Sequence, residues 1–171
     1  MKAQALNRKQ FIHGKLSNEQ AIRPPWSVDE SVFTQACTRC YKCAESCHSQ
    51  LIVKGTGGFP EMSFLRHGCD YCEACVRACP ENVLIKNEIA EKPAWQQCAV
   101  IDESCFSTRG TVCRACGEVC ESQAIKFKPA VGGVSTINLN PASCDGCGEC
   151  VHVCPAHAIK IQKIKVEMLH E

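Results

Sequence analysis

Residues 69–80 read CDYCEACVRACP, four cysteines in the spacing C-x2-C-x2-C-x3-C with a proline after the last one. Residues 37–47 and 144–154 repeat that spacing, and residues 105–120 lengthen it to C-x7-C-x2-C-x3-C. Three thiolates spaced by two residues can bind three corners of a cuboidal iron–sulfur cluster, while the fourth ligates a neighbouring cluster. Four such runs therefore predict four [4Fe–4S] clusters.

Other uses of these cysteines fit the pattern less well. A disulfide framework is typical of shorter secreted chains, and its cysteines would not repeat so tightly. Structural zinc usually takes two C-x2-C pairs, and this spacing would leave surplus thiolates. We therefore predict sixteen metal-ligating residues, namely Cys37, Cys40, Cys43, Cys47, Cys69, Cys72, Cys75, Cys79, Cys105, Cys113, Cys116, Cys120, Cys144, Cys147, Cys150 and Cys154.

The composition agrees with an interior built partly from clusters. The chain has 171 residues but only six Phe, two Trp and two Tyr. Metal-binding energy would then be folding energy, so the apo-protein should fold poorly. The formal charge is +1, and four clusters of about −2 each would bring it to about −7. The sequence contains neither an apolar stretch of membrane-spanning length nor basic residues interleaved with aromatics, so we expect no integral membrane segment and no nucleic-acid partner.

The chain reads as an internal duplication. Residues 51–64 and 125–139 each predict a short hairpin with glycines at the turn, and proline follows the last cysteine of every second run. We predict an α+β fold of two tandem bacterial ferredoxin-like 2[4Fe–4S] units, with short hairpins and short helices carrying the later cysteines. The predicted boundaries are 28–89 for the first unit and 90–171 for the second.

Two pairings of the runs remain open. Sequential pairing gives four ligand sets: Cys37, Cys40, Cys43 and Cys79; Cys69, Cys72, Cys75 and Cys47; Cys105, Cys113, Cys116 and Cys154; Cys144, Cys147, Cys150 and Cys120. Nested pairing joins the first run to the fourth and the second to the third. The sixteen ligands are the same in both.

Residues 1–27 contain no cysteine and form a predicted N-terminal extension, a candidate partner-docking segment. Arg8 and Lys9 echo a twin-arginine export motif, but no apolar segment follows them, so we expect a retained, cytoplasmic protein. The stretch Arg23–Ser27 holds two prolines and Trp26, which either packs on the cluster domain or contacts a partner. The lysine-rich run at 160–165 is interpreted as a solvated face, with a docking surface as the alternative.

Cys98 is the seventeenth cysteine, and we interpret it as an unligated, packed thiol on a strand at 97–102. Cys105 follows a short strand, as Cys144 does, and is therefore preferred over Cys98 as a ligand. His48 and His67 lie near ligands and could donate hydrogen bonds to them, although packing or surface roles are the simpler interpretation. The sequence shows no catalytic residues, phosphate loop or dinucleotide fingerprint, so we do not expect an enzyme.

Several segments together resemble the NapF ferredoxin-type proteins of bacterial periplasmic nitrate reductase systems. They are Arg23–Ser27, Gly57–Pro60, the long-spaced third run and residues 144–150. The resemblance implies a cytoplasmic accessory protein that transfers electrons to, or matures, the molybdenum-containing catalytic subunit before its export. Other redox proteins of that system are further candidate partners. A permanent electron-transfer subunit of a larger membrane-associated respiratory oxidoreductase is the alternative, and a module whose clusters only hold the fold is a third.

Overall fold

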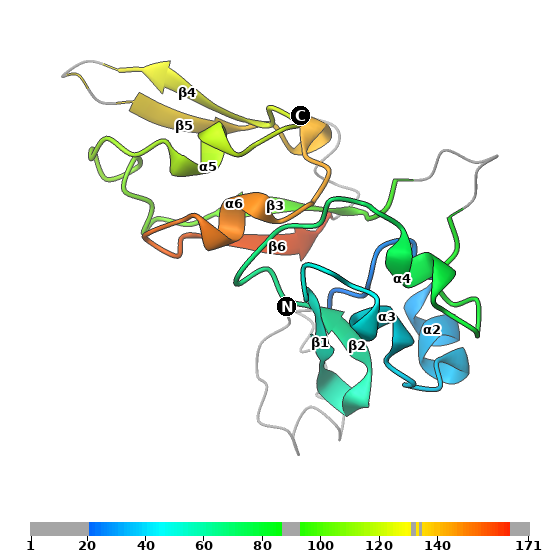
Figure 1. Ribbon diagram of the computed structural model, residues 1–171. Helices are drawn as coiled ribbons and strands as arrows, with labels where there is room; N and C mark the ends of the chain where they lie inside the picture. The colour runs from blue at the N-terminus through cyan, green and yellow to red at the C-terminus, as the bar shows by residue number, and fades with distance from the viewer. Residues whose placement is uncertain (1–20, 87–92, 131–132, 134, 165–171) are drawn as a thin grey trace, which may run out of the picture.

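The computed structural model describes residues 21–86, 93–130, 133 and 135–164. Figure 1 shows two groups of elements, which we call the first half (residues 21–86) and the second half (residues 93–164). Residues 1–20 of the predicted extension and the predicted boundary at 89/90 lie outside the described residues. Short helices and two-stranded sheets make up both halves, as predicted.

Each half contains the hairpin expected from its glycine turn. In the first half, β1 (Ile52–Lys54) pairs antiparallel with β2 (Pro60–Met62), and the 3-10 turn η1 (Thr56–Gly58) joins them. Gly57 has φ +68°, a left-handed conformation that favours glycine. In the second half, β4 (Ile125–Pro129) pairs antiparallel with β5 (Ser135–Leu139) over five residues.

A second antiparallel pair brackets the cysteine runs of the second half. There β3 (Gln97–Ile101) precedes the third run and pairs with β6 (Ile159–Lys163), which follows the fourth. The first half has the same arrangement reduced to a single bridge between Ser27 and Leu84. Both halves therefore close by joining the chain before their first run to the chain after their second, which is the layout of a ferredoxin-like unit.

Four one-turn helices carry the third cysteine of each run. They are α3 (Lys42–Glu45), α4 (Ala74–Arg77), α5 (Ala115–Glu118) and α6 (Glu149–His152), and the cysteines Cys43, Cys75, Cys116 and Cys150 are all buried. Helix α3 packs against α4, and α5 against α6. The two runs of each half are thereby held side by side. The remaining elements are helix α2 (Glu30–Ala36) and the 3-10 turn η2 (Pro141–Ser143).

The side chain of Arg23 is buried in the first half. Its guanidinium lies 2.6 Å from the Glu30 carboxylate and 3.5 Å from that of Glu61. It also lies over the rings of Phe33 and Phe59, at 5.2 and 5.4 Å from their centroids. A buried arginine needs such pairing, so this end of the predicted extension is part of the folded body.

Trp26 and its neighbours also make intramolecular contacts. The backbone N–H of Trp26 donates to the carbonyl of Ala94 at 2.8 Å. The Trp26 ring lies edge-on to the ring of Tyr71, with 6.2 Å between the two centroids. The indole remains half-buried. Packing of Trp26, one of the two alternatives from the sequence, is the arrangement found.

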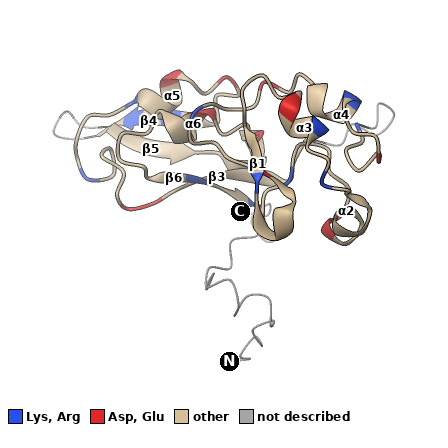
Figure 2. Cartoon of the chain, turned by 60° about the horizontal axis from the view of Figure 1, so that its bottom comes forward, with Lys and Arg blue, Asp and Glu red and all other residues tan. Residues whose placement is uncertain are grey.

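The two halves have separate buried cores. Phe33, Ile52, Val83 and Leu84 belong to the first, and Ile125 and Ile159 are in the second. Figure 2 shows Lys and Arg interspersed with Asp and Glu over the described chain. Within the described residues, no helix has the length and apolar character needed to cross a membrane.

Candidate metal centres

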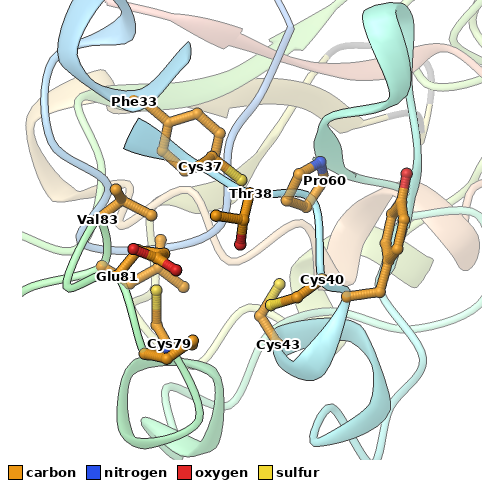
Figure 3. A pocket seen from close by; sticks show the side chains of 12 residues that line it. Phe33, Cys37, Thr38, Cys40, Cys43, Pro60, Cys79, Glu81 and Val83 are labelled. Atoms are coloured by element: carbon orange, nitrogen blue, oxygen red, sulfur yellow. The ribbon is translucent and has the colours of Figure 1, made fainter. Parts of the chain in front are cut away.

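Four thiols line one hollow in the first half (Figure 3). Cys37, Cys40 and Cys43 come from the first run and Cys79 from the end of the second. The hollow spans about 340 Å³, counting the space at its open side, and is otherwise lined mostly by apolar side chains, including Phe33 and Val83. These are the four residues that sequential pairing assigns to one cluster.

A matching hollow of about 300 Å³ lies in the second half. Its thiols come from Cys105, Cys113, Cys116 and Cys154, again three from one run and the last from the next. The seven-residue spacer after Cys105 folds as a turn, in which the N–H of Arg109 donates to the Cys105 carbonyl. The longer spacing therefore keeps Cys105 beside the other three.

The remaining eight ligand candidates form two further groups. Burial raises the pKa of Cys69 to about 12, and the nearby thiols of Cys75 and Cys47 act in the same direction. Burial likewise raises the pKa of Cys75 to about 11, with Cys72 among the contributing neighbours. Cys43 of the first hollow is also a neighbour of Cys75, so the grouping of Cys47, Cys69, Cys72 and Cys75 follows the predicted pairing of the runs.

The fourth group lies around Cys150 in the second half. Burial raises the pKa of the Cys150 thiol, and the thiols of Cys147, Cys144 and Cys120 raise it further. Buried thiols with raised pKa values are protonated near neutral pH, so binding iron must release their protons. The four groups together contain all sixteen predicted ligands.

Backbone N–H groups point at several of the sulfurs. Leu51 donates to Cys47 at 3.5 Å, and Ala158 donates to Cys154 at 3.3 Å, each from four residues further along the chain. Ala99 donates to Cys144 at 3.5 Å. Such donors stabilise thiolate charge and are typical of the surroundings of iron–sulfur clusters.

Cys98 is buried on β3 and is absent from the lining of the second-half hollow. Burial raises the pKa of its thiol, and the nearby Cys144 acts in the same direction. Its position agrees with a packed thiol. All seventeen cysteines lie in the described residues, and none of them forms a disulfide.

The group that contains Cys69 and the group that contains Cys147 meet at a contact between the halves, which we call the joint. The N–H of Cys69 donates to the carbonyl of Cys147 at 2.8 Å, and the Tyr71 hydroxyl donates to the carbonyl of Asp145 at 2.9 Å. The joint was not predicted from the sequence, because its residues lie far apart in the chain. Tyr71 and Asp145, for example, are separated by 74 positions.

Glycine at position 148 lets the halves approach at the joint. Gly148 has φ +80°, and a Cβ atom there would lie 2.2 Å from the Phe64 ring of the first half. Tyr41 and Glu73 occupy the corresponding positions before α3 and α4 and also have positive φ. The close approach of Phe64, rather than the backbone conformation alone, therefore requires glycine.

Of the two histidines singled out in the sequence, only His48 contacts a predicted ligand. Its ring lies beside Cys72 and Asp70, whereas the His67 ring lies 5.9 Å from that of His152. Asp70 was not identified in advance. The repeated Cys-Asp-x-Cys at 69–72 and 144–147 could have indicated it.

The donor set fits [4Fe–4S] clusters. Each hollow gathers four thiols, three from one run and the last from the next, and the two hollows repeat this composition in the two halves. Thiolate ligation of this kind is what these clusters require.

Two models of iron–sulfur domains match the chain. A 4Fe–4S dicluster domain matches residues 111–158, and a 4Fe–4S binding domain matches residues 34–55 and 66–82. Both matches cover cysteine runs, one in each half. They support cluster binding by the two halves.

Relatives extend the similarity beyond the cysteine runs. The chain is 39% identical to the ferredoxin-type protein NapF of Escherichia coli over 145 residues, 85% of each chain. It is 37% identical to NapF of Haemophilus influenzae, over 96% of this chain and 98% of the relative. A methylamine utilization ferredoxin-type protein, MauM of Methylobacillus flagellatus, is 28% identical over 86% of this chain and 69% of its own.

Proposed function

Because this chain belongs to the NapF ferredoxin-type protein family and carries 4Fe–4S clusters, we propose that it is an accessory protein for periplasmic nitrate reductase. It transfers electrons to the molybdenum-containing catalytic subunit, or matures it, before that subunit is exported. It works in the cytoplasm as an electron carrier rather than as an enzyme. The family consists of ferredoxin-type iron–sulfur proteins. Its name supports the proposal that the partner is a nitrate reductase.

The proposed cofactor content is four [4Fe–4S] clusters with sequential pairing. The geometry supports this pairing, because each of two hollows gathers the four thiols that sequential pairing predicts, three from one run and one from the next run of the same half. The proposed units correspond to residues 28–89 and 90–171. The sixteen ligands are those predicted from the spacing, with Cys105 included and Cys98 left out.

One observation carries the electron-transfer role: the four groups follow one another through the molecule. The first two groups are neighbours, since α3, which carries Cys43, packs against α4, which carries Cys75. The last two are neighbours, since α5, which carries Cys116, packs against α6, which carries Cys150. The joint brings the second and fourth groups together through Cys69 and Cys147. The spatial order of the groups therefore differs from their order in the chain. The joint connects the two groups of the first half to the two groups of the second.

Electron transfer is tested directly with the loaded chain. Anaerobically purified protein should contain about sixteen iron atoms per chain. Reduced chain mixed with oxidised catalytic subunit should transfer its electrons to that subunit. Stopped-flow absorbance should show the clusters of the chain becoming oxidised as the subunit is reduced. Zinc in place of iron, or clusters that never exchange electrons with the subunit, would overturn the proposal. A stable stoichiometric complex that survives purification would favour the permanent-subunit alternative.

Partner capture tests the N-terminal extension. Arg23 is buried in the first half, so a deletion should end at residue 20 to leave the fold intact. We expect the chain lacking residues 1–20 to keep its iron and to capture less catalytic subunit, and capture should favour the subunit that still carries its signal peptide. A docking segment that buries an aromatic or similar anchor typically contributes about 2 kcal/mol, enough for a clear loss. Unchanged capture would assign recognition to the cluster-bearing body.

A further inference from the structure

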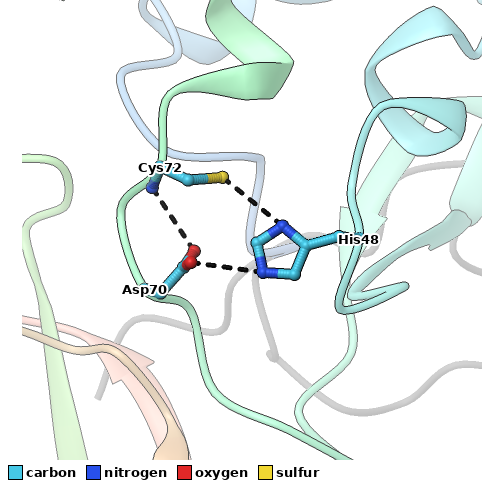
Figure 4. Close-up of side chains that lie close together, drawn as sticks. All are labelled: His48, Asp70 and Cys72. Carbon is cyan, nitrogen blue, oxygen red and sulfur yellow. Dashed lines mark hydrogen bonds and ion pairs between the residues drawn. The ribbon is translucent and has the colours of Figure 1, made fainter.

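His48, Asp70 and Cys72 form a compact group outside the hollows (Figure 4). Nδ1 of His48 lies 3.8 Å from the sulfur of Cys72, and Nε2 lies 3.2 Å from Oδ2 of Asp70. The other carboxylate oxygen of Asp70 accepts the backbone N–H of Cys72 at 3.3 Å. Asp70 thus contacts both the histidine and the cysteine, and it holds the ring against the sulfur.

The ring is placed between two acceptors. Oδ2 of Asp70 is a carboxylate oxygen, and the sulfur of Cys72 becomes a proton-free thiolate once it ligates iron. Each ring nitrogen therefore faces an atom that can only accept, and donating to both takes the doubly protonated, imidazolium form of the ring. The same three side chains could also surround a metal ion, but Cys72 already belongs to a thiol group and the two nitrogens point to different partners. The geometry favours hydrogen-bond donation over metal binding.

The second half provides the matched comparison. Asp145 corresponds to Asp70, and its Oδ1 accepts the N–H of Cys147 at 3.0 Å. Glu121 follows the last cysteine of its run where His48 does in the first half, so an acid replaces the histidine.

We propose that His48, oriented by Asp70, donates a hydrogen bond to the sulfur of Cys72 and makes the cluster ligated by Cys47, Cys69, Cys72 and Cys75 easier to reduce than its counterpart in the second half. A hydrogen bond to a ligating sulfur draws charge from the iron, which favours the reduced state with its extra electron. His48 is therefore a positioning residue that sets a potential. This inference rests on the proposed cluster ligation.

Redox titration of the full chain tests the proposal at one fixed pH, with cluster reduction followed by electron paramagnetic resonance. We expect His48→Ala to keep all its iron and to lower the reduced-to-oxidised ratio of one cluster about tenfold at a given electrode potential. For a one-electron couple this is a shift of about 59 mV to lower potential. His48→Gln, whose amide can still donate, should recover part of the shift.

Asp70→Asn and Glu121→Ala are the companion variants. Asp70→Asn should shift the same cluster by less than His48→Ala does, because losing the ring's charged partner lowers the potential while losing a nearby negative charge raises it. Glu121→Ala removes an exposed side chain at the equivalent position of the second half. It should leave the potential of the first-half cluster ligated by Cys72 unchanged. Full iron with unchanged potentials in His48→Ala would overturn the inference, as would an equal shift of all clusters. Absence of four clusters in the unmodified chain would instead refute the ligation itself.

Discussion

The two halves hold the same thiol groups with different amounts of strand pairing. The second half is bracketed by β3 and β6 over five paired residues and has a five-residue hairpin. The first half has a three-residue hairpin and a single bridge. There Arg23, set between two phenylalanine rings and two glutamates, supplies contacts that strands supply in the second half. The cysteine spacing thus dictates the ligand loops, while the surrounding support can vary.

Removing the iron should have the largest effect on stability, and the two halves should differ in how readily they lose structure. Metal binding contributes much of the folding energy of small cluster domains, so both should lose structure under a strong chelator in the absence of oxygen. The first half should lose backbone protection first, because less strand pairing remains to hold it. Hydrogen exchange with mass spectrometry measures this. Protection that persists equally in β1–β2 and β4–β5 would show that the strand difference is unimportant.

Cysteine substitution tests whether the halves ligate alike. Cys105 lines the second-half hollow as Cys37 lines the first, so Cys105→Ser should lose up to one cluster, about four iron atoms. Cys98→Ser is the matched control and should keep its iron, since Cys98 lies outside that hollow. Iron analysis of anaerobically purified variants decides between them. The opposite result would transfer ligation to Cys98.

Arg23→Ala should destabilise the first half by about 2 kcal/mol, because it removes a buried side chain packed against two aromatic rings and leaves the half-buried Glu61 carboxylate without its partner. Denaturant unfolding of the loaded protein, followed by a probe in each half, gives the loss. Arg77→Ala removes an exposed arginine on α4 and serves as the control. A loss shared equally by both halves would mean that Arg23 is not specific support for the first.

Gly148→Ala should weaken the joint by about 2 kcal/mol, the typical cost of forcing atoms into a packed site. Gly110→Ala is the matched control, since Gly110 has φ +79° but nothing within 4 Å of an added Cβ. Both variants meet the same backbone penalty, and only the first meets Phe64. Comparable losses in thermal unfolding of the two variants would show that the contact with Phe64 contributes little.

The parts that were predictable depend on local signals. Glycine turns located both hairpins, and the cysteine spacing located the helices that carry Cys43, Cys75, Cys116 and Cys150. β6 was missed because its lysines suggested a solvated face. Ile159 and Ile161 alternate with Lys160 and Gln162 along it, which is the period of a strand.

Longer-range features could not be read from the chain. Arg23 was grouped with a docking segment because prolines follow it, and nothing local indicates that its partners, Glu61 and Phe59, come from the hairpin. The contact of Cys69 with Cys147 likewise joins two loops whose residues carry no mutual signal. His48 was noticed for its position beside a ligand, but its contacts with Asp70 and Cys72 depend on how α3 and the second run pack.

The antiparallel pairing of β3 with β6 has a consequence for biosynthesis. A ribosome delivers the chain from its N-terminus, so Leu84 meets Ser27 early and the first half can close while later residues are still being added. β3 emerges next but has no partner until Lys163 has been made, because β6 contains the last residues of that sheet. Cysteines of the third run therefore stay accessible to a cluster donor until the fourth run and β6 have also been made. Nascent chains from which residues up to 95 have emerged from the ribosome should already accept iron and sulfide into the first half.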